Sequence, residues 1–120
     1  MTAPAPPGYH TITPRIFAPD PEGFVAFLRA VFGASGELAN GAPAEMRIGD
    51  SIVIVSGTEY REPMPACLYV YVDDADGTYL RAVEAGATSL EDPRDVAYGD
   101  RRAMVKDSWN NIWQIASRRA

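Results

Sequence analysis

The chain has 120 residues, of which 47% are hydrophobic and 22% charged, and its formal net charge at pH 7 is −5. This composition is that of one globular domain, and the acidic balance argues against nucleic-acid binding, which requires clustered Lys and Arg. No apolar run approaches the ~20 residues that cross a membrane, the N-terminus lacks the features of a signal peptide, and the single cysteine, Cys67, excludes an intramolecular disulfide, so we expect a cytoplasmic protein with no membrane partner.

The first half of the chain begins with an arm, a strand and a helix. Residues 1–8 are rich in Pro and Ala and predict a flexible arm. Alternating and β-branched residues predict a strand over 9–17, with Pro14 marking an edge or an irregularity. Asp20 is a suitable N-cap for the helix that follows, and Gly33 is placed to end it.

This helix carries an apolar stripe that we expect to face the core. Its members fall at helical spacing and are Phe24, Phe27, Leu28, Val31 and Phe32. A weak strand near 36–38 comes next. A hairpin then follows, with strands predicted at 44–48 and 51–56 and its turn at Gly49-Asp50.

The second half repeats this order after a linker at 58–65, which has two prolines and no periodicity. A strand is predicted over 67–72, and the acidic run "DDADG" then caps a helix that ends at Gly86. The apolar residues expected to face the core from this helix are Tyr79, Leu80, Val83 and Ala87. A short strand and a loop within 88–100 lead to a final hairpin, "RRAMVKD" and "NIWQIAS", in which Trp113 is expected to pack under a helix.

The tetrapeptide Leu-Arg-Ala-Val stands in both predicted helices, at 28–31 and at 80–83. Because the neighbouring elements also match, we interpret residues 9–120 as one domain made of one module built twice, at about 9–57 and 66–118. The predicted fold is α+β: two tandem βαβββ modules form an open, curved mixed sheet with the helices outside. In each copy Leu and Val are expected to face the sheet and Arg the solvent. The concave face of the sheet is the expected small-molecule site.

The order and spacing of several short strings resemble one known superfamily over almost the whole chain. The strings are "YHTITPRIF", "FLRAVFGA", "AEMRIGDS", "LYVYVDD", "AVEAGAT", "YGDR" and "DSWNNIWQIAS". Together they resemble the vicinal oxygen chelate superfamily of glyoxalases, bleomycin-resistance proteins, fosfomycin-resistance enzymes and extradiol dioxygenases, most closely its PhnB-like branch. The resemblance implies the paired-module fold and a homodimer. In the last turn Ser108 and Asn110 stand where the family has Pro and Gly, and Asn tolerates the positive φ of such a turn.

Metal-dependent members of this superfamily hold a divalent cation through His, Glu or Gln side chains, and the resemblance places the matching positions at Thr13, Cys67 and Gln114. A hydroxyl, a thiol and an amide without imidazole or carboxylate make a poor metal site. The only histidine, His10, falls on the opposite strand face from Thr13 and is expected at the surface. We therefore expect no metal and no other cofactor. For Cys67, a nucleophile would need a nearby base, and a buried core cysteine is the expected alternative.

The candidate ligand-binding residues are Thr13, Arg15, Cys67, Tyr69, Tyr71, Tyr98, Trp109 and Gln114. Alternation places Tyr69 and Tyr71 on the face of Cys67, which the resemblance turns toward the cavity, and aromatic rings with a polar group suit planar ligands. Tyr98 and Trp109 stand beside predicted turns that could close the mouth of this cavity. Arg15 shares the face of Thr13 and could bind an anionic ligand. Ordinary packing is the alternative for the aromatic residues, and a surface position is the alternative for Arg15.

Three functions follow from this interpretation. The first is a metal-independent protein that binds a small molecule, such as an antibiotic or a metabolite, in the concave cleft, as bleomycin-resistance proteins do. The second is a metal-dependent lyase, isomerase or dioxygenase with a non-standard site. The third is a relic of the fold, or a regulatory partner, whose cleft is filled by its own side chains. The missing metal ligands and the aromatic candidates favour the first.

Overall fold

The computed structural model describes residues 5–39, 42–59 and 61–119. Residues 1–4 of the predicted arm and residue 60 of the predicted linker lie outside this range. The contacts divide the chain into two compact units, Met1–Arg29 with Gly33–Met64 and Ala30–Phe32 with Pro65–Ala120. No helix in the described ranges is long and apolar enough to cross a membrane.

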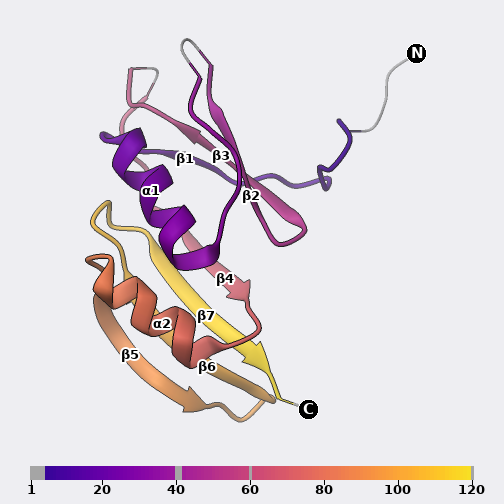
Figure 1. Ribbon diagram of the computed structural model, residues 1–120, viewed down its shortest axis with the longest axis vertical. Helices are drawn as coiled ribbons and strands as arrows, with labels where there is room; N and C mark the ends of the chain where they lie inside the picture. The colour runs from indigo at the N-terminus through magenta and orange to yellow at the C-terminus, as the bar shows by residue number, and fades with distance from the viewer. Residues whose placement is uncertain (1–4, 40–41, 60, 120) are drawn as a thin grey trace. The chain divides into compact units, whose positions relative to one another are not determined.

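The first unit contains a three-stranded sheet and most of one helix (Figure 1). Its elements are β1 (Arg15–Phe17), α1 (Pro21–Phe32), β2 (Ala44–Ile48) and β3 (Ser51–Ser56). The strand order is β1-β3-β2, with β1 parallel and β2 antiparallel to β3. Alternate strand residues build most of the core, and the buried ones are Ile16, Ala44, Met46, Val53 and Val55; Ile52 of β3 is buried as well. The hairpin predicted at 44–48 and 51–56 is confirmed, with Gly49 at a φ of 57° in its turn.

The bounds of α1 follow from its two caps. The Asp20 carboxylate accepts a hydrogen bond from the Gly23 backbone nitrogen at 3.1 Å, and Pro21 takes the first helical position. At the other end Gly33 adopts a φ of 64°, and its N–H reaches the Arg29 carbonyl. The predicted apolar stripe is confirmed for the buried Phe24, Phe27, Leu28 and Val31, while Phe32 is half-buried.

Two strands of the first unit differ from the prediction. The strand expected over 9–17 is wrong in its first part, since β1 begins only at Arg15. Pro14 explains this difference: its carbonyl accepts a hydrogen bond from Ile54 at 2.9 Å, but it has no N–H to donate and it restricts the residue before it. The strand expected at 36–38 is absent from the described residues, because Gly36 turns away at a φ of 127° after a single bridge at Ser35.

The second unit contains a four-stranded sheet and one helix (Figure 1). Its elements are β4 (Cys67–Tyr71), α2 (Ala75–Glu84), β5 (Thr88–Asp95), β6 (Asp100–Lys106) and β7 (Ile112–Arg118). The strand order is β4-β7-β6-β5, with β4 parallel to β7 and the other pairs antiparallel. Helix α2 packs on this sheet through contacts to β5, β6 and β7. The predicted α+β class, with two helices and open mixed sheets, is confirmed.

The core-facing stripe predicted for α2 is largely wrong. The buried residues of this helix are Ala75, Thr78 and Ala82. Leu80 is 58% exposed and Val83 is 40% exposed, although both were expected to face the sheet. The reason is the start of each helix: Leu28 stands eight positions after its N-cap, Asp20, whereas Leu80 stands only six after Asp74. Two positions rotate a side chain by about 200° around a helix, so the repeated tetrapeptide presents opposite faces.

Candidate functional site

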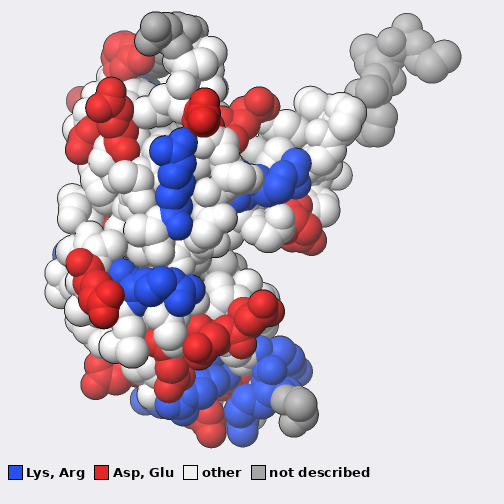
Figure 2. All heavy atoms as spheres, viewed as in Figure 1, with Lys and Arg blue, Asp and Glu red and all other residues white. Residues whose placement is uncertain are grey.

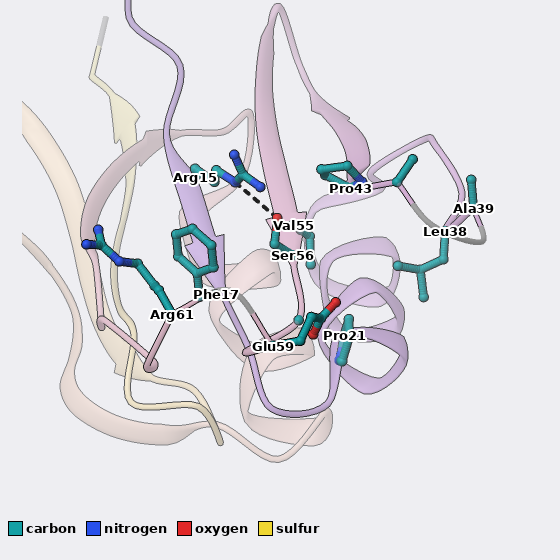
Figure 3. A pocket seen from close by; sticks show the side chains of 12 residues that line it. Arg15, Phe17, Pro21, Leu38, Ala39, Pro43, Val55, Ser56, Glu59 and Arg61 are labelled. Atoms are coloured by element: carbon teal, nitrogen blue, oxygen red, sulfur yellow. Dashed lines mark hydrogen bonds between the residues drawn. The ribbon is translucent and has the colours of Figure 1, made fainter.

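A cavity of about 680 Å³ opens in the first unit beside β1 and the end of β3 (Figure 3). Its lining comes from these two strands, from the first residue of α1, and from the loops before β2 and after β3. The lining residues are Arg15, Phe17, Pro21, Leu38, Ala39, Ala42, Pro43, Val55, Ser56, Gly57, Glu59 and Arg61. This volume lies within the range of ordinary small-molecule sites.

Strand alternation turns Arg15 and Phe17 to the same side of β1, while Ile16 between them is buried in the core. The parallel register places Phe17 opposite Ser56 of β3. Arg15 Nε donates a 3.0 Å hydrogen bond to Ser56 Oγ, drawn as the dashed line in Figure 3. The Ser56 side chain is nearly fully buried, so this contact holds the arginine against the sheet.

Two arginines approach the same aromatic ring in this cavity. The Cζ atom of Arg15 lies 5.0 Å from the Phe17 ring centroid, and that of Arg61 lies 5.9 Å from it. Both distances are within the range of cation–π attraction. Cation–π attraction does not itself use the N–H donors of a guanidinium group. Neither arginine forms an ion pair with any other residue that the structure describes.

The cavity lining is positive although the chain is acidic. Arg15 and Arg61 contribute two positive charges and Glu59 one negative charge, which gives +1 for the lining, against −5 for the chain. Glu59 folds back over Gly57, where an added Cβ would lie 2.2 Å from its Oε2 atom. Figure 3 shows the Glu59 carboxylate near Pro21, away from the two guanidinium groups. The cavity therefore has a cationic end and an acidic end.

In the second unit, two tyrosine hydroxyls donate hydrogen bonds to one carboxylate. Tyr69 and Tyr71 donate their hydroxyls to Asp100 Oδ2 at 2.7 and 2.8 Å, and Arg118 Nη1 donates to Asp100 Oδ1 at 3.0 Å. The Asp100 carboxylate is fully buried, whereas the rings of Tyr69 and Tyr71 are 37% and 60% exposed. The ring centroids lie 5.4 Å apart with the planes tilted by 52°.

These hydrogen bonds shift the pKa values of Asp100, Tyr69 and Tyr71. The hydrogen bond from Tyr69, helped by those from Arg118 and Tyr71, holds the pKa of Asp100 below its usual value, although burial opposes this shift. Burial and the bond to Asp100 raise the pKa of the Tyr69 hydroxyl, and the bond to Asp100 raises that of Tyr71. At neutral pH the three groups therefore form an ionised acceptor with two neutral donors.

A second set of hydrogen-bonded polar side chains, formed by Glu91, Tyr98 and Arg102, lies on β5, on β6 and in the turn between them. Arg102 is bound by the Glu91 carboxylate at 3.1 Å and donates a 2.6 Å hydrogen bond to the Tyr98 hydroxyl. Arg101, which precedes Arg102 on the opposite face of β6, binds Asp76 at 2.7 Å and Asp95 at 3.2 Å. On the face shown in Figure 2, Lys and Arg side chains are interspersed with Asp and Glu. Most of the cationic groups of the second unit are thus already partnered.

The three positions compared with metal ligands are divided between the two units. Thr13 lies before β1, outside any strand, in the first unit. Cys67 Sγ lies 3.8 Å from Gln114 Oε1 in the second unit, on neighbouring strands. No group of three or more His, Cys, Asp or Glu side chains in the described part of the chain is placed to hold a metal ion. The expectation of a buried Cys67 is wrong, because this thiol is exposed.

The other predicted residues are also divided between the two units. Arg15 lines the cavity of the first unit, while Tyr69 and Tyr71 stand on the sheet of the second unit with Cys67. Trp109 lies in the turn before β7, where its backbone nitrogen donates to Asp107 at 2.9 Å. His10 is exposed, as expected, with Nε2 2.8 Å from the Asp50 carbonyl oxygen.

Trp113 is buried, which confirms the prediction that it belongs to the core. Its ring centroid lies 4.9 Å from that of Phe32 in α1, and its Nε1 donates to Asp107 Oδ2 at 2.8 Å. The turn before β7 also confirms the expected tolerance of Asn for a positive φ, since Asn110 adopts a φ of 70°. The aromatic ring of Trp113 therefore serves the scaffold.

The sequence interpretation missed several polar partners. Phe17, Ser56 and Arg61 in the cavity were not predicted, nor were Asp100 and Arg118 beside the tyrosines. For Phe17 a signal was present, since it alternates with Arg15 in the same strand. For Arg61 there was none, because it stands in an aperiodic loop. From the sequence, Asp100 is expected to be an ordinary turn residue, and nothing near it indicates that its carboxylate is buried.

Known proteins resemble part of this sequence. No family model matches the chain. Uncharacterized proteins from Mycobacterium bovis and Mycobacterium tuberculosis are 33% identical to it over 51 residues, or 42% of this chain and 34% and 30% of theirs. The chain thus spans about a third of the length of these curated relatives.

Solved structures match nearly the whole chain. TioX from Micromonospora sp. ML1 is 25% identical, with a TM-score of 0.77 over 89% of this chain and 97% of that one. A glyoxalase/bleomycin resistance protein/dioxygenase family enzyme from Burkholderia phytofirmans PsJN is 21% identical, with a TM-score of 0.74 over 88% and 95%. A glyoxalase-related enzyme from Fulvimarina pelagi is 17% identical, with a TM-score of 0.74 over 90% and 87%. The chain therefore has the glyoxalase-like fold.

Proposed function

We propose that this chain is a small-molecule-binding protein of the glyoxalase/bleomycin-resistance type that holds its ligand without a metal. The observation that carries the proposal is the cavity of about 680 Å³ in the first unit, lined by apolar side chains and by a few polar groups that include two arginines. Ligand sites generally combine an apolar lining with a small number of placed polar groups that orient the ligand.

The donor chemistry of the chain supports binding without a metal. Divalent cations are held by imidazole, thiolate or carboxylate groups that converge on one point. In the cavity, Glu59 is the single carboxylate of the lining, and it folds back over Gly57. Arg15 and Arg61 repel a cation. A ligand in this cavity would be oriented by hydrogen bonds and apolar contacts instead.

A screen on metal-stripped protein tests the proposal. The full chain is treated with a chelator, and its thermal unfolding is followed against a library of neutral, anionic and cationic small molecules. A ligand that binds only the folded state raises the melting temperature by mass action. The structure predicts hits whose effect is lost in Ala42→Trp, which places a large side chain at the cavity wall, and kept in Ala26→Trp, on the exposed face of α1.

Two results would count against this function. The first is a set of hits that all bind Ala42→Trp and the wild type equally well. The second is one tightly bound divalent ion per chain, lost together with an enzymatic activity when Gln114 is changed to Ala, which would favour the metal-dependent lyase, isomerase or dioxygenase. Gln114 and Cys67 are neighbours in the second unit, so this variant leaves the cavity of the first unit intact.

Further expectations belong to the same proposal. Resemblance to the superfamily supports a homodimer and a place in the PhnB-like branch, and the acidic composition supports a protein that does not bind nucleic acid. Light scattering on the purified chain measures the mass of the particle directly. A mass near 13.0 kDa, that of one chain, would refute the dimer.

A further inference from the structure

We infer that the ligand of the first unit's cavity is an organic anion with a flat apolar body, whose anionic group is bound by Arg15, with Arg61 adding positive charge nearby, and whose body lies against the apolar wall of the cavity. This inference rests on the proposed function, because it names the chemical class of the ligand at the same cavity. It is carried by the two guanidinium groups, by the aromatic ring between them and by the apolar wall.

The first step is the approach of two cations to one aromatic ring. Arg15 and Arg61 come from β1 and from the loop after β3, and both guanidinium groups approach the ring of Phe17, at 5.0 and 5.9 Å. Like charges repel, so bringing two of them to one ring is favourable only when their contacts compensate. The ring supplies part of this compensation, and an anion bound by Arg15 would supply more.

The second step is the hydrogen-bonding capacity that remains. Arg15 donates its Nε–H to Ser56, and its two terminal nitrogens form no hydrogen bond with the part of the chain that the structure describes. A guanidinium group presents paired N–H donors that match the two oxygens of a carboxylate or the oxygens of a phosphate. Within the described residues no Asp or Glu occupies this position for either arginine. A ligand anion fits it chemically.

The third step is the local charge. The chain as a whole carries −5, which repels anions at a distance, whereas the cavity lining carries +1. At physiological ionic strength, charges more than about 8 Å apart are largely screened. The charges nearest to a bound group therefore dominate, and beside the guanidinium groups of Arg15 and Arg61 an anion is favoured over a cation.

The fourth step is the apolar wall. Beyond the arginines, the cavity is lined by Phe17 and by small and aliphatic side chains, which are Pro21, Leu38, Ala39, Ala42, Pro43 and Val55. A small inorganic anion would contact the arginines but leave this wall in water. Burying a flat hydrocarbon body against it adds roughly 25 cal/mol for each Å² removed from water. The combination selects an amphipathic anion.

Isothermal titration calorimetry on the metal-free full chain at pH 7 tests this class with three probes. 2-Naphthoate carries both the anion and the flat body, 2-naphthamide has nearly the same shape without the charge, and acetate has the charge without the body. We expect 2-naphthoate to bind at least tenfold more tightly than 2-naphthamide, and acetate to give no measurable heat.

Matched variants locate the preference. Arg15→Gln should reduce the naphthoate-to-naphthamide ratio of affinities toward one, and Arg61→Gln should reduce it less, because Arg61 adds charge without holding the anion. Arg15→Lys should keep only part of the ratio, because a lysine lacks the planar pair of donors. Phe17→Leu should weaken both probes alike. The control is Arg47→Gln, which removes an exposed arginine of the same unit that does not line the cavity. It should leave the ratio unchanged.

The failures of the two proposals can be told apart. If both naphthalene probes bind equally and both are lost in Ala42→Trp, the cavity binds small molecules but the anion preference is wrong. If neither probe binds while neutral or cationic hits from the screen are lost in Ala42→Trp, the ligand class is again wrong and the proposed function stands. If nothing that binds responds to Ala42→Trp, both are overturned.

Discussion

Arg15 on β1 and Ser56 at the end of β3 are joined side chain to side chain by a 3.0 Å hydrogen bond across a parallel strand pair. Ser56 is buried, whereas Arg15 is exposed to the cavity. The bond therefore connects the hydrophobic core of the first unit to its candidate ligand site. It also restricts a long, flexible side chain before any ligand arrives, which reduces the entropy lost on binding.

Ser56→Ala tests this connection. We expect it to lower the free energy of unfolding by about 0.5–1.5 kcal/mol, the usual net contribution of one hydrogen bond. It should also weaken the binding of 2-naphthoate severalfold, since the Arg15 side chain is no longer held in place. Urea unfolding and calorimetry measure the two effects. Ser51→Ala, at the exposed start of β3, is the control, and equal effects of the two variants on binding would contradict the role of Ser56.

The network around Asp100 predicts how stability depends on pH. The pKa of Asp100 is lowered by folding, so its contribution is present above the unfolded pKa of about 3.9 and is lost as the pH falls through the lower folded pKa. The pKa values of Tyr69 and Tyr71 are raised, so their contribution is present below about 10 and is lost as the pH rises through the higher folded values. Urea unfolding across the pH range should show a loss of stability at both ends.

A double variant separates this network from the general effect of pH. In Tyr69→Phe/Tyr71→Phe, Asp100 keeps Arg118 but loses both hydroxyl donors, so its pKa should move back toward the ordinary value. Tyr79→Phe is the control, since that hydroxyl binds Ser89 and Asp92 instead. The ¹³C resonance of the Asp100 carboxyl reports the titration directly. A midpoint that is the same in the double variant and the wild type would refute this account.

Local signals account for what could be predicted from the sequence. The hairpin of β2 and β3 followed from alternation and a Gly-Asp turn, and α1 followed from Asp20, Gly33 and its apolar stripe. Arg15 was identified as a candidate by alternation alone, and it does line the cavity. These features depend on residues close together in the chain. Periodicity and capping describe such residues well.

What could not be predicted depends on tertiary contacts. Arg61 joins the cavity through an aperiodic loop, and Asp100 is buried because three donors from β4 and β7 converge on it. No pattern within either segment reveals such a partner. The position of the N-cap matters in the same way. The repeated tetrapeptide stands two positions closer to the N-cap in α2 than in α1, so a different face of the same four residues is buried.

The turn before β7 should be the most sensitive point of the second unit. Asp107 is buried and accepts hydrogen bonds from the backbone of Trp109 and Asn111 and from Trp113 Nε1. In Asp107→Ala these donors lose their acceptor, and we expect a loss of about 2–4 kcal/mol in the free energy of unfolding. Intrinsic tryptophan fluorescence follows the unfolding, because both tryptophans of the chain contact Asp107.

Asp73→Ala is the matched control for this variant. Asp73 is an exposed aspartate of the same unit, in the turn between β4 and α2, so its removal should change the free energy of unfolding by less than about 0.5 kcal/mol. A loss at Asp107 as small as that at Asp73 would show that water replaces the carboxylate in the turn.

The two copies of Leu-Arg-Ala-Val provide a matched pair of variants within one chain. Leu28 is fully buried in α1, so Leu28→Ala removes apolar contacts and leaves a cavity, and we expect it to cost about 2–5 kcal/mol. Leu80 occupies the same place in the repeated string but is 58% exposed, so Leu80→Ala should cost less than about 1 kcal/mol. Urea unfolding of the two variants measures the difference. Similar losses would mean that the two strings are equivalent in packing after all, and that the offset from Asp20 and Asp74 does not decide which side of each helix is buried.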